Sequence, residues 1–248
     1  ATVGRARPAR PTLRARPAFV AEAVALLAWG GMLALHAGPP HHAAGGSLHA
    51  ALHATPAAVA RGAGSAAGAV AAGLPGWLLM TAAMMVPAVW PAAWRVGTGS
   101  LRRRRHRAVA EFLAAYLLVW AAFGAVALAL LSRATPPLAA VLATAAVWQL
   151  TPWHRACAVA CHRATPLPPT GRAAVRGTTR YGLRLGLACA GSCWALMAVM
   201  AVATTGHLAW SLALGAAVAA QRVLVRPRRT ARLVGGLLAL ASGVAVLV

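Results

Sequence analysis

The chain has 248 residues, of which 60% are hydrophobic and only 10% are charged, and its mean hydropathy is +0.68. Soluble domains carry about a quarter charged residues, so this composition cannot cover a water-facing surface and indicates a protein embedded in a lipid bilayer. All 24 basic residues are arginine and the only acids are Glu22 and Glu111. The absence of lysine excludes a P-loop and Schiff-base chemistry, and paired-carboxylate hydrolysis would have to use these two acids. We therefore expect no enzymatic activity and identify no catalytic residue.

Seven apolar segments approach the length that a membrane-spanning helix needs, which is about 20 residues. None shows the alternating polarity of barrel strands. We predict an all-α, multi-pass membrane protein with a basic tail over residues 1–17 and a single membrane domain over residues 18–248. The fourth and seventh segments are short, which leaves a six-span alternative. The seven predicted spans are Ala18–Leu35, Leu74–Trp94, Phe112–Leu131, Pro137–Thr151, Leu185–Thr205, Leu208–Val225 and Leu233–Val248.

The arginines alternate between the two sides of these spans. Twenty-two lie in the tail and in the second, fourth and sixth loops, whereas the first and third loops hold one each and the fifth holds none. The positive-inside rule then predicts a cytoplasmic N-terminus and an outer C-terminus, in a bacterial cytoplasmic membrane. Residues 36–73 become an outer loop rich in His, Ala and Gly, and residues 152–184 become a cytoplasmic loop. Because the charge flanks apolar spans, the expected partner is the lipid bilayer and not a nucleic acid.

Four cysteines form two pairs with the same spacing. Cys157 and Cys161 lie in the fourth loop, and Cys189 and Cys193 lie in the fifth span. A spacing of four places both thiols of a pair on one face of a helix, where they can share a soft ion such as Cu(I), or Zn(II). His154 extends the face of the first pair. The alternative for either pair is that buried cysteines act as small, inert apolar side chains.

Methionines extend this pattern of sulfur ligands in two spans. Thioethers select Cu(I) over hard ions, and Pro87 disturbs the second span beside its methionines, as broken helices do at transporter sites. The alternative is that methionine fills gaps between packed helices. The predicted ligands are Met80, Met84 and Met85 in the second span and Met197 in the fifth.

Histidines are concentrated in and beside the first outer loop. Imidazole binds transition metals, so this loop predicts weak capture of metal ions on the outer side. Histidines at equal depth can also ligate haem, and His36 with His207 gives the alternative of a haem-bearing membrane oxidoreductase. The residues predicted to capture metal are His36, His41, His42, His49 and His53.

Three motifs resemble, in the same order, those of a poorly characterised bacterial family of integral membrane proteins that are predicted to bind metal, a domain of unknown function. The resemblance covers roughly Trp77 to Arg222 and implies an integral membrane fold with a predicted metal-binding role. The family usually has a third cysteine where this chain has Ser192. The motifs are Met-Met-x-Pro at Met84–Pro87, Thr-Pro at Thr151–Pro152 followed by Cys157-x3-Cys161, and Cys-x-Gly-x-Cys-Trp at Cys189–Trp194.

Together these patterns predict binding, transfer or transport of a soft metal ion across the membrane, with copper as the favoured ion and zinc as the second. The outer loop would concentrate ions, the Cys and Met ligands of the bundle would bind Cu(I), and the first cysteine pair would receive or release it. The expected protein partner is a metal chaperone or a larger membrane enzyme complex. The alternative function is a non-catalytic accessory or assembly subunit of such an enzyme.

Overall fold

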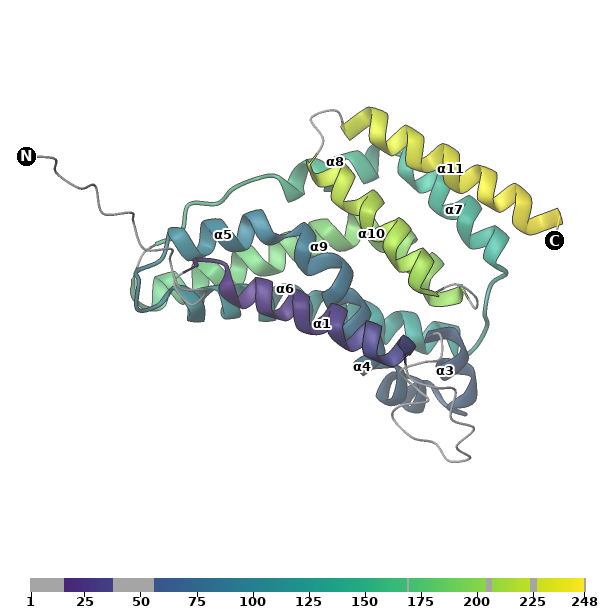
Figure 1. Cartoon of the computed structure of the whole chain (residues 1–248), viewed down its shortest axis with the longest axis horizontal. Coiled ribbons are helices and arrows are strands. Elements are labelled where there is room, and N and C mark those ends of the chain that lie inside the picture. Colours follow the sequence, from purple (N-terminus) through teal and green to yellow (C-terminus); the bar gives the residue numbers. More distant parts are fainter. Residues whose placement is uncertain (1–15, 38–55, 169, 204–206, 224–226, 248) are drawn as a thin grey trace, which may run out of the picture.

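The computed structural model describes residues 16–37, 56–168, 170–203, 207–223 and 227–247, and its helices pack into one bundle (Figure 1). All regular elements in these ranges are α-helices, which confirms the all-helical class for the described part of the chain. The helices are α1 (Phe19–Ala37), α3 (Pro56–Gly62), α4 (Ala66–Ala88), α5 (Trp90–Thr98), α6 (Arg105–Leu131), α7 (Leu138–Leu150), α8 (Pro152–Cys161), α9 (Gly171–Val202), α10 (His207–Val223) and α11 (Pro227–Leu247).

Four of these helices are long and apolar enough to cross a membrane, namely α4, α6, α9 and residues 229–246 of α11. Helices α1, α7 and α10 contain shorter apolar stretches. Each of the seven predicted spans therefore overlaps an apolar helix, and a helical membrane protein fits the structure. The count of seven spans and their orientation stay predictions.

Glycines set the close packing of α4, α6 and α9. A methyl group at Gly182 of α9 would lie 2.5 Å from the Phe112 carbonyl oxygen of α6, and one at Gly73 of α4 would lie 2.7 Å from a Leu128 methyl of α6. The indole of Trp77 packs on Gly124 and donates from Nε1 to the Trp120 carbonyl, 3.0 Å away. Small residues allow helix backbones to approach in a bilayer, where water does not drive helices together.

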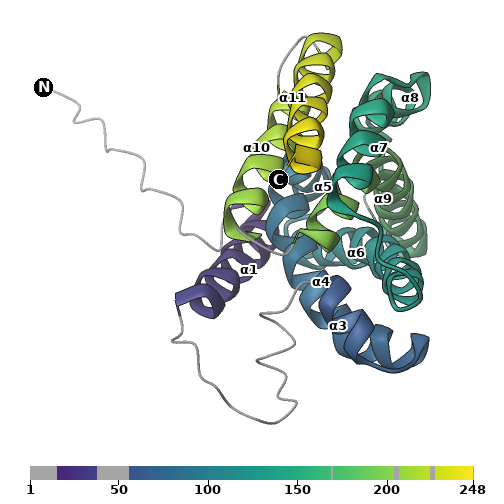
Figure 2. The same ribbon diagram turned by 90° about the vertical axis from the view of Figure 1, so that its right-hand side faces the viewer.

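Helices α7 and α11 lie side by side on one flank of this core (Figures 1 and 2). Ser242 of α11 donates to the Ala139 carbonyl of α7 at 2.9 Å. Helix α10 joins the same flank through the Gln221 side-chain amide, which donates to Gln149 Oε1 of α7 at 3.2 Å. These polar contacts link α7 to α11 and to α10.

Two predicted loops contain more helix than expected. Residues 36–73 were predicted as an outer loop, yet α3 and the start of α4 lie within them, because the segment is rich in alanine and Ser65 caps α4 by accepting from Gly68 N at 3.0 Å. The predicted second span, Leu74–Trp94, is interrupted at Val89, where α4 ends and α5 begins. In residues 152–184, helix α8 and the first turns of α9 leave only a short connection.

Candidate metal centre

Helix α8 is placed by its own first residues and by one glycine of α9. Thr151 caps α8 by accepting from His154 N at 3.1 Å, and Pro152 stands at its first position, where no backbone donor is needed. A methyl group at Gly191 of α9 would lie 2.6 Å from Cys157 Sγ of α8. Trp148 of α7 donates to the Gly191 carbonyl at 3.1 Å. Gly191 is therefore the point where α7 and α8 meet α9.

Beside Gly191, the hydroxyl of Ser192 contacts one thiol from each sequence pair. Ser192 Oγ lies 4.0 Å from Cys161 Sγ of α8 and 3.4 Å from Cys193 Sγ of α9, and it donates to the Cys189 carbonyl at 3.0 Å. Cys161 and Cys193 are 4% and 2% exposed. We call Cys161 and Cys193 the cross-helix pair. A thiol of α8 and a thiol of α9 therefore contact the same hydroxyl.

The remaining two cysteines have different surroundings, and none of the four is in a disulfide. Cys157 is half-buried over Gly191, whereas Cys189 is fully buried and accepts a hydrogen bond from the Tyr116 hydroxyl of α6 at 3.0 Å. Sequence reasoning did not identify Tyr116, and it included Gly191 only as the glycine of the motif at Cys189–Trp194. A small residue at that position allows a second helix to approach.

The described part of the chain contains no group of three His, Cys, Asp or Glu side chains close enough to hold one metal ion. A structural zinc site uses four such ligands, so this arrangement does not fit one. The cross-helix pair offers two sulfur donors, which suit a soft ion with few ligands, such as Cu(I).

His154 is 2% exposed, and within the described residues neither of its ring nitrogens makes a geometric hydrogen bond. It lies on α8, in the segment predicted to be cytoplasmic. Burial lowers the pKa of its imidazole, the nearby Gln221 amide offsets part of this shift, and Arg155 adds to it. The lowered pKa favours the neutral form of the ring, which is the form that binds a metal ion. The structure does not join it to Cys157 and Cys161 in a three-ligand site.

The predicted methionine ligands are all buried in the core that also contains Cys189 and Cys193. Met197 lies one turn beyond Cys193 on α9. Their burial agrees equally with packing and with metal binding, so their role as ligands stays a prediction. The methionines are Met80, Met84, Met85 and Met197, exposed by 3%, 3%, 0% and 0%.

The structure does not describe four of the histidines predicted to capture metal on the outer side, namely His41, His42, His49 and His53. It also does not describe the side chains of His36, which is the fifth of them, and of His207, which belongs to the haem alternative. Metal capture and the haem alternative therefore stay predictions.

A cavity of about 350 Å³ lies where α4 meets α5. We call it the corner cavity. Cys161 and His162 contribute to its wall from α8 and its C-terminal end, and Arg95 contributes from α5. The corner cavity reaches the cross-helix pair, because Cys161 belongs to both.

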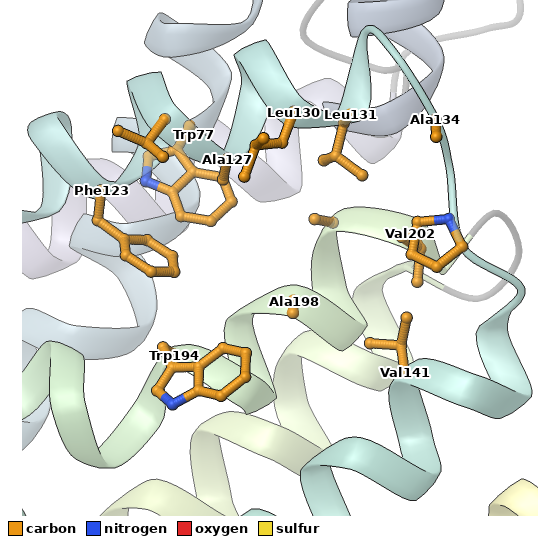
Figure 3. Close-up of a pocket in the computed structure, with 13 residues that line it drawn as sticks. Trp77, Phe123, Ala127, Leu130, Leu131, Ala134, Val141, Trp194, Ala198 and Val202 are labelled. Carbon is orange, nitrogen blue, oxygen red and sulfur yellow. The ribbon is translucent and has the colours of Figure 1, made fainter.

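A second cavity, of about 360 Å³, lies between α6, α7 and α9 (Figure 3). Trp194 and Ala198 of α9 face Trp77 and Leu130 across it. Its wall consists of aliphatic and aromatic side chains without a thiol, thioether or imidazole, so it does not provide a copper site.

A family model described as PpoB2, copper chaperone, matches residues 74–246. The matched region contains all four cysteines, the four predicted methionine ligands and both cavities. No curated protein and no solved structure gives a significant match. Because the match extends over more than half of the sequence, the chain belongs to the PpoB2 copper chaperone family.

Proposed function

We propose that this protein binds Cu(I) between α8 and α9 and delivers it to a partner protein. The observation that carries the proposal is the Ser192 hydroxyl, which contacts the sulfur atoms of both Cys161 and Cys193. Two buried thiols from different helices form a soft-donor site, and the family description names copper as the ion. Four helices able to span a membrane support a site held within or beside the bilayer.

Binding requires both sulfurs of the cross-helix pair to reach the same ion. Metal–thiolate bonds of about 2.3 Å bring two sulfur donors to within roughly 4 to 5 Å of each other. The Ser192 hydroxyl is already bonded to the Cys189 carbonyl of its own helix, so it keeps a partner when the thiols move together. Both thiols lose a proton on binding, and copper affinity therefore increases with pH.

Methionines provide the next soft donors along the bundle. Met197 follows Cys193 by one helical turn, and Met84 and Met85 lie buried near the end of α4. As the finer part of this proposal, these methionines would pass Cu(I) along the membrane-spanning helices. The family description favours delivery to a protein over transport through the membrane, so we assign the methionines a secondary role.

A second candidate function is that of an accessory subunit that loads copper into a larger membrane enzyme, and it shares with the first the copper-chaperone description of the family. The two functions differ in the lifetime of the complex. A subunit co-purifies with its enzyme, whereas a carrier transfers copper and then dissociates.

The test compares two double variants that each lose two thiols. Cys161→Ser/Cys193→Ser removes the cross-helix pair, and Cys157→Ser/Cys189→Ser removes the other two cysteines. After anaerobic loading of detergent-purified protein, copper per chain is measured by elemental analysis, with circular dichroism as the check on folding.

We expect the first variant to lose its copper and the second to retain most of it. Equal copper content in both variants and in wild type would refute the site. An equal loss of copper in both variants would show that the cross-helix pair is not the whole site and that Cys157 or Cys189 also binds the ion.

A further inference from the structure

The corner cavity has the size and the mixed wall of a small-molecule site. Its volume of about 350 Å³ lies within the range of about 300 to 1,000 Å³ that is typical of ligand pockets. Such pockets combine apolar walls with a few polar groups that fix orientation. The wall here includes the apolar Pro87, Trp90 and Leu185, and the polar Arg95, Cys161 and His162.

Cys161 connects this cavity to the cross-helix pair. Its side chain lines the cavity and its sulfur lies 4.0 Å from Ser192 Oγ. Cys161 is only 4% exposed, so little of it is open at the surface, and the cavity provides a path to its sulfur. A small molecule seated in the cavity can follow this path.

Arg95 gives the cavity a positive charge. Its Nη2 donates to the Tyr181 hydroxyl at 3.2 Å, which holds the exposed side chain and leaves other guanidinium donors available for a carboxylate. Within the described residues no acidic side chain lines the cavity. The nearby Glu22 accepts from Trp90 Nε1 at 3.3 Å and is balanced by Arg16 at 3.6 Å. The chain as a whole has a formal net charge of +22, which attracts anions.

We propose that the corner cavity binds a small anionic complex of Cu(I) with a carboxylate-bearing thiol, from which Cys161 takes up the ion. This inference rests on the proposed function and names the source of its copper. Arg95 binds a carboxylate of the complex and positions its copper next to Cys161. A Cys161 Sγ–copper bond forms, one copper–sulfur bond of the complex breaks, and the Cys161 thiol proton passes to the departing thiolate. Cys193 then forms the second sulfur–copper bond as the remaining copper–sulfur bond of the complex breaks, and the Cys193 thiol proton passes to that departing thiolate. Copper stays Cu(I) throughout.

The test measures the rate of copper uptake from two donors. Cu(I)–glutathione is the anionic thiol donor, and Cu(I) in acetonitrile is a donor without carboxylates. The variants are Arg95→Gln and Arg95→Lys. Arg172→Gln is the matched control, because Arg172 is an exposed arginine of α9 that does not line the cavity.

We expect Arg95→Gln to slow uptake from Cu(I)–glutathione by about tenfold or more, as the loss of a charge-assisted hydrogen bond does. Arg95→Lys keeps the positive charge but loses the planar, forked set of guanidinium donors. Its rate of uptake from Cu(I)–glutathione should therefore lie between the rates of wild type and of Arg95→Gln. Uptake from acetonitrile and the final copper content should not change in either variant. Arg172→Gln should match wild type with both donors.

Three other outcomes would overturn the inference in distinct ways. Equal rates for Arg95→Gln and Arg172→Gln with both donors would show that the cavity does not bind the anionic complex. An equal loss for Arg95→Gln with both donors would show that Arg95 supports the structure around Cys161 and does not bind the carboxylate of the donor. A wild-type protein that takes up no copper from either donor would refute the proposed function itself.

Discussion

Gly191→Ala tests the contact on which the candidate site depends. The added methyl group would lie 2.6 Å from Cys157 Sγ, whereas ordinary contact begins at 3.4 Å, so the sulfur or the whole of α8 must move by about 0.8 Å. Overpacking of this kind costs roughly 1 to 3 kcal/mol, and replacing a helical glycine by alanine returns about 0.5 to 1 kcal/mol. The two ranges allow a net loss in the free energy of unfolding between about 0 and 2.5 kcal/mol, and we expect a loss of about 1 kcal/mol.

The loss should also appear in copper binding, because a displaced α8 carries Cys161 away from Cys193. Thermal unfolding in detergent, followed by circular dichroism, measures stability, and a competition titration with a Cu(I) chelator measures affinity. The double variant Gly191→Ala/Cys157→Ala removes the sulfur that the methyl group meets, so it should recover most of the stability.

Gly30→Ala is the control for the substitution itself, since a methyl group there meets nothing within 4 Å. It should leave stability unchanged or slightly increased. If Gly191→Ala behaves like Gly30→Ala in both assays, then α8 does not rest on Gly191, and the geometry assigned to the cross-helix pair is wrong.

Two further variants test the chemistry around this contact. Ser192→Cys places a third sulfur between those of the cross-helix pair, so Cu(I) affinity in the same competition titration should rise by at least about tenfold, and an unchanged affinity would contradict the site. His154→Gln tests the buried imidazole, whose pKa is lowered mainly by burial. The stability that the neutral, buried imidazole contributes is complete above the ordinary pKa of 6.5. It decreases as the pH falls below 6.5, because the unfolded chain takes up a proton more readily than the folded chain does. Thermal midpoints measured between pH 5 and 8 should decrease less on acidification for His154→Gln than for wild type, and parallel curves would contradict this assignment.

The fold class was predictable from the sequence because a bilayer restricts composition so strongly. Apolar runs such as Phe112–Leu131 identify helices without any knowledge of their packing, and that segment lies inside α6. The helix boundaries were harder to predict, because the hydropathy of a segment carries no information about the residues that cap a helix. Ser65 begins α4 eight residues before the predicted loop ends, and the helix break at Val89 interrupts a segment that is apolar on both sides.

The site was predictable only at the level of a single helix. A spacing of four predicts that two thiols share one face of a helix, and each pair does lie within a single helix, α8 or α9. It could not show that Cys161 and Cys193 contact the same hydroxyl, because that depends on how α8 lies on α9. The two helices are separated by a connection whose course no local pattern determines. The same limit explains why Tyr116, on a third helix, was missed as the partner of Cys189.

The serine between the two sulfurs has a consequence for how long copper would stay. An oxygen in that position coordinates a soft ion weakly, so an ion held by the cross-helix pair would keep a vacant coordination position. An incoming thiolate can use this vacancy before either outgoing bond has broken, which shortens the residence time. A protein that must release its cargo on demand benefits from such an incomplete ligand set, whereas a storage protein would be served better by a third sulfur.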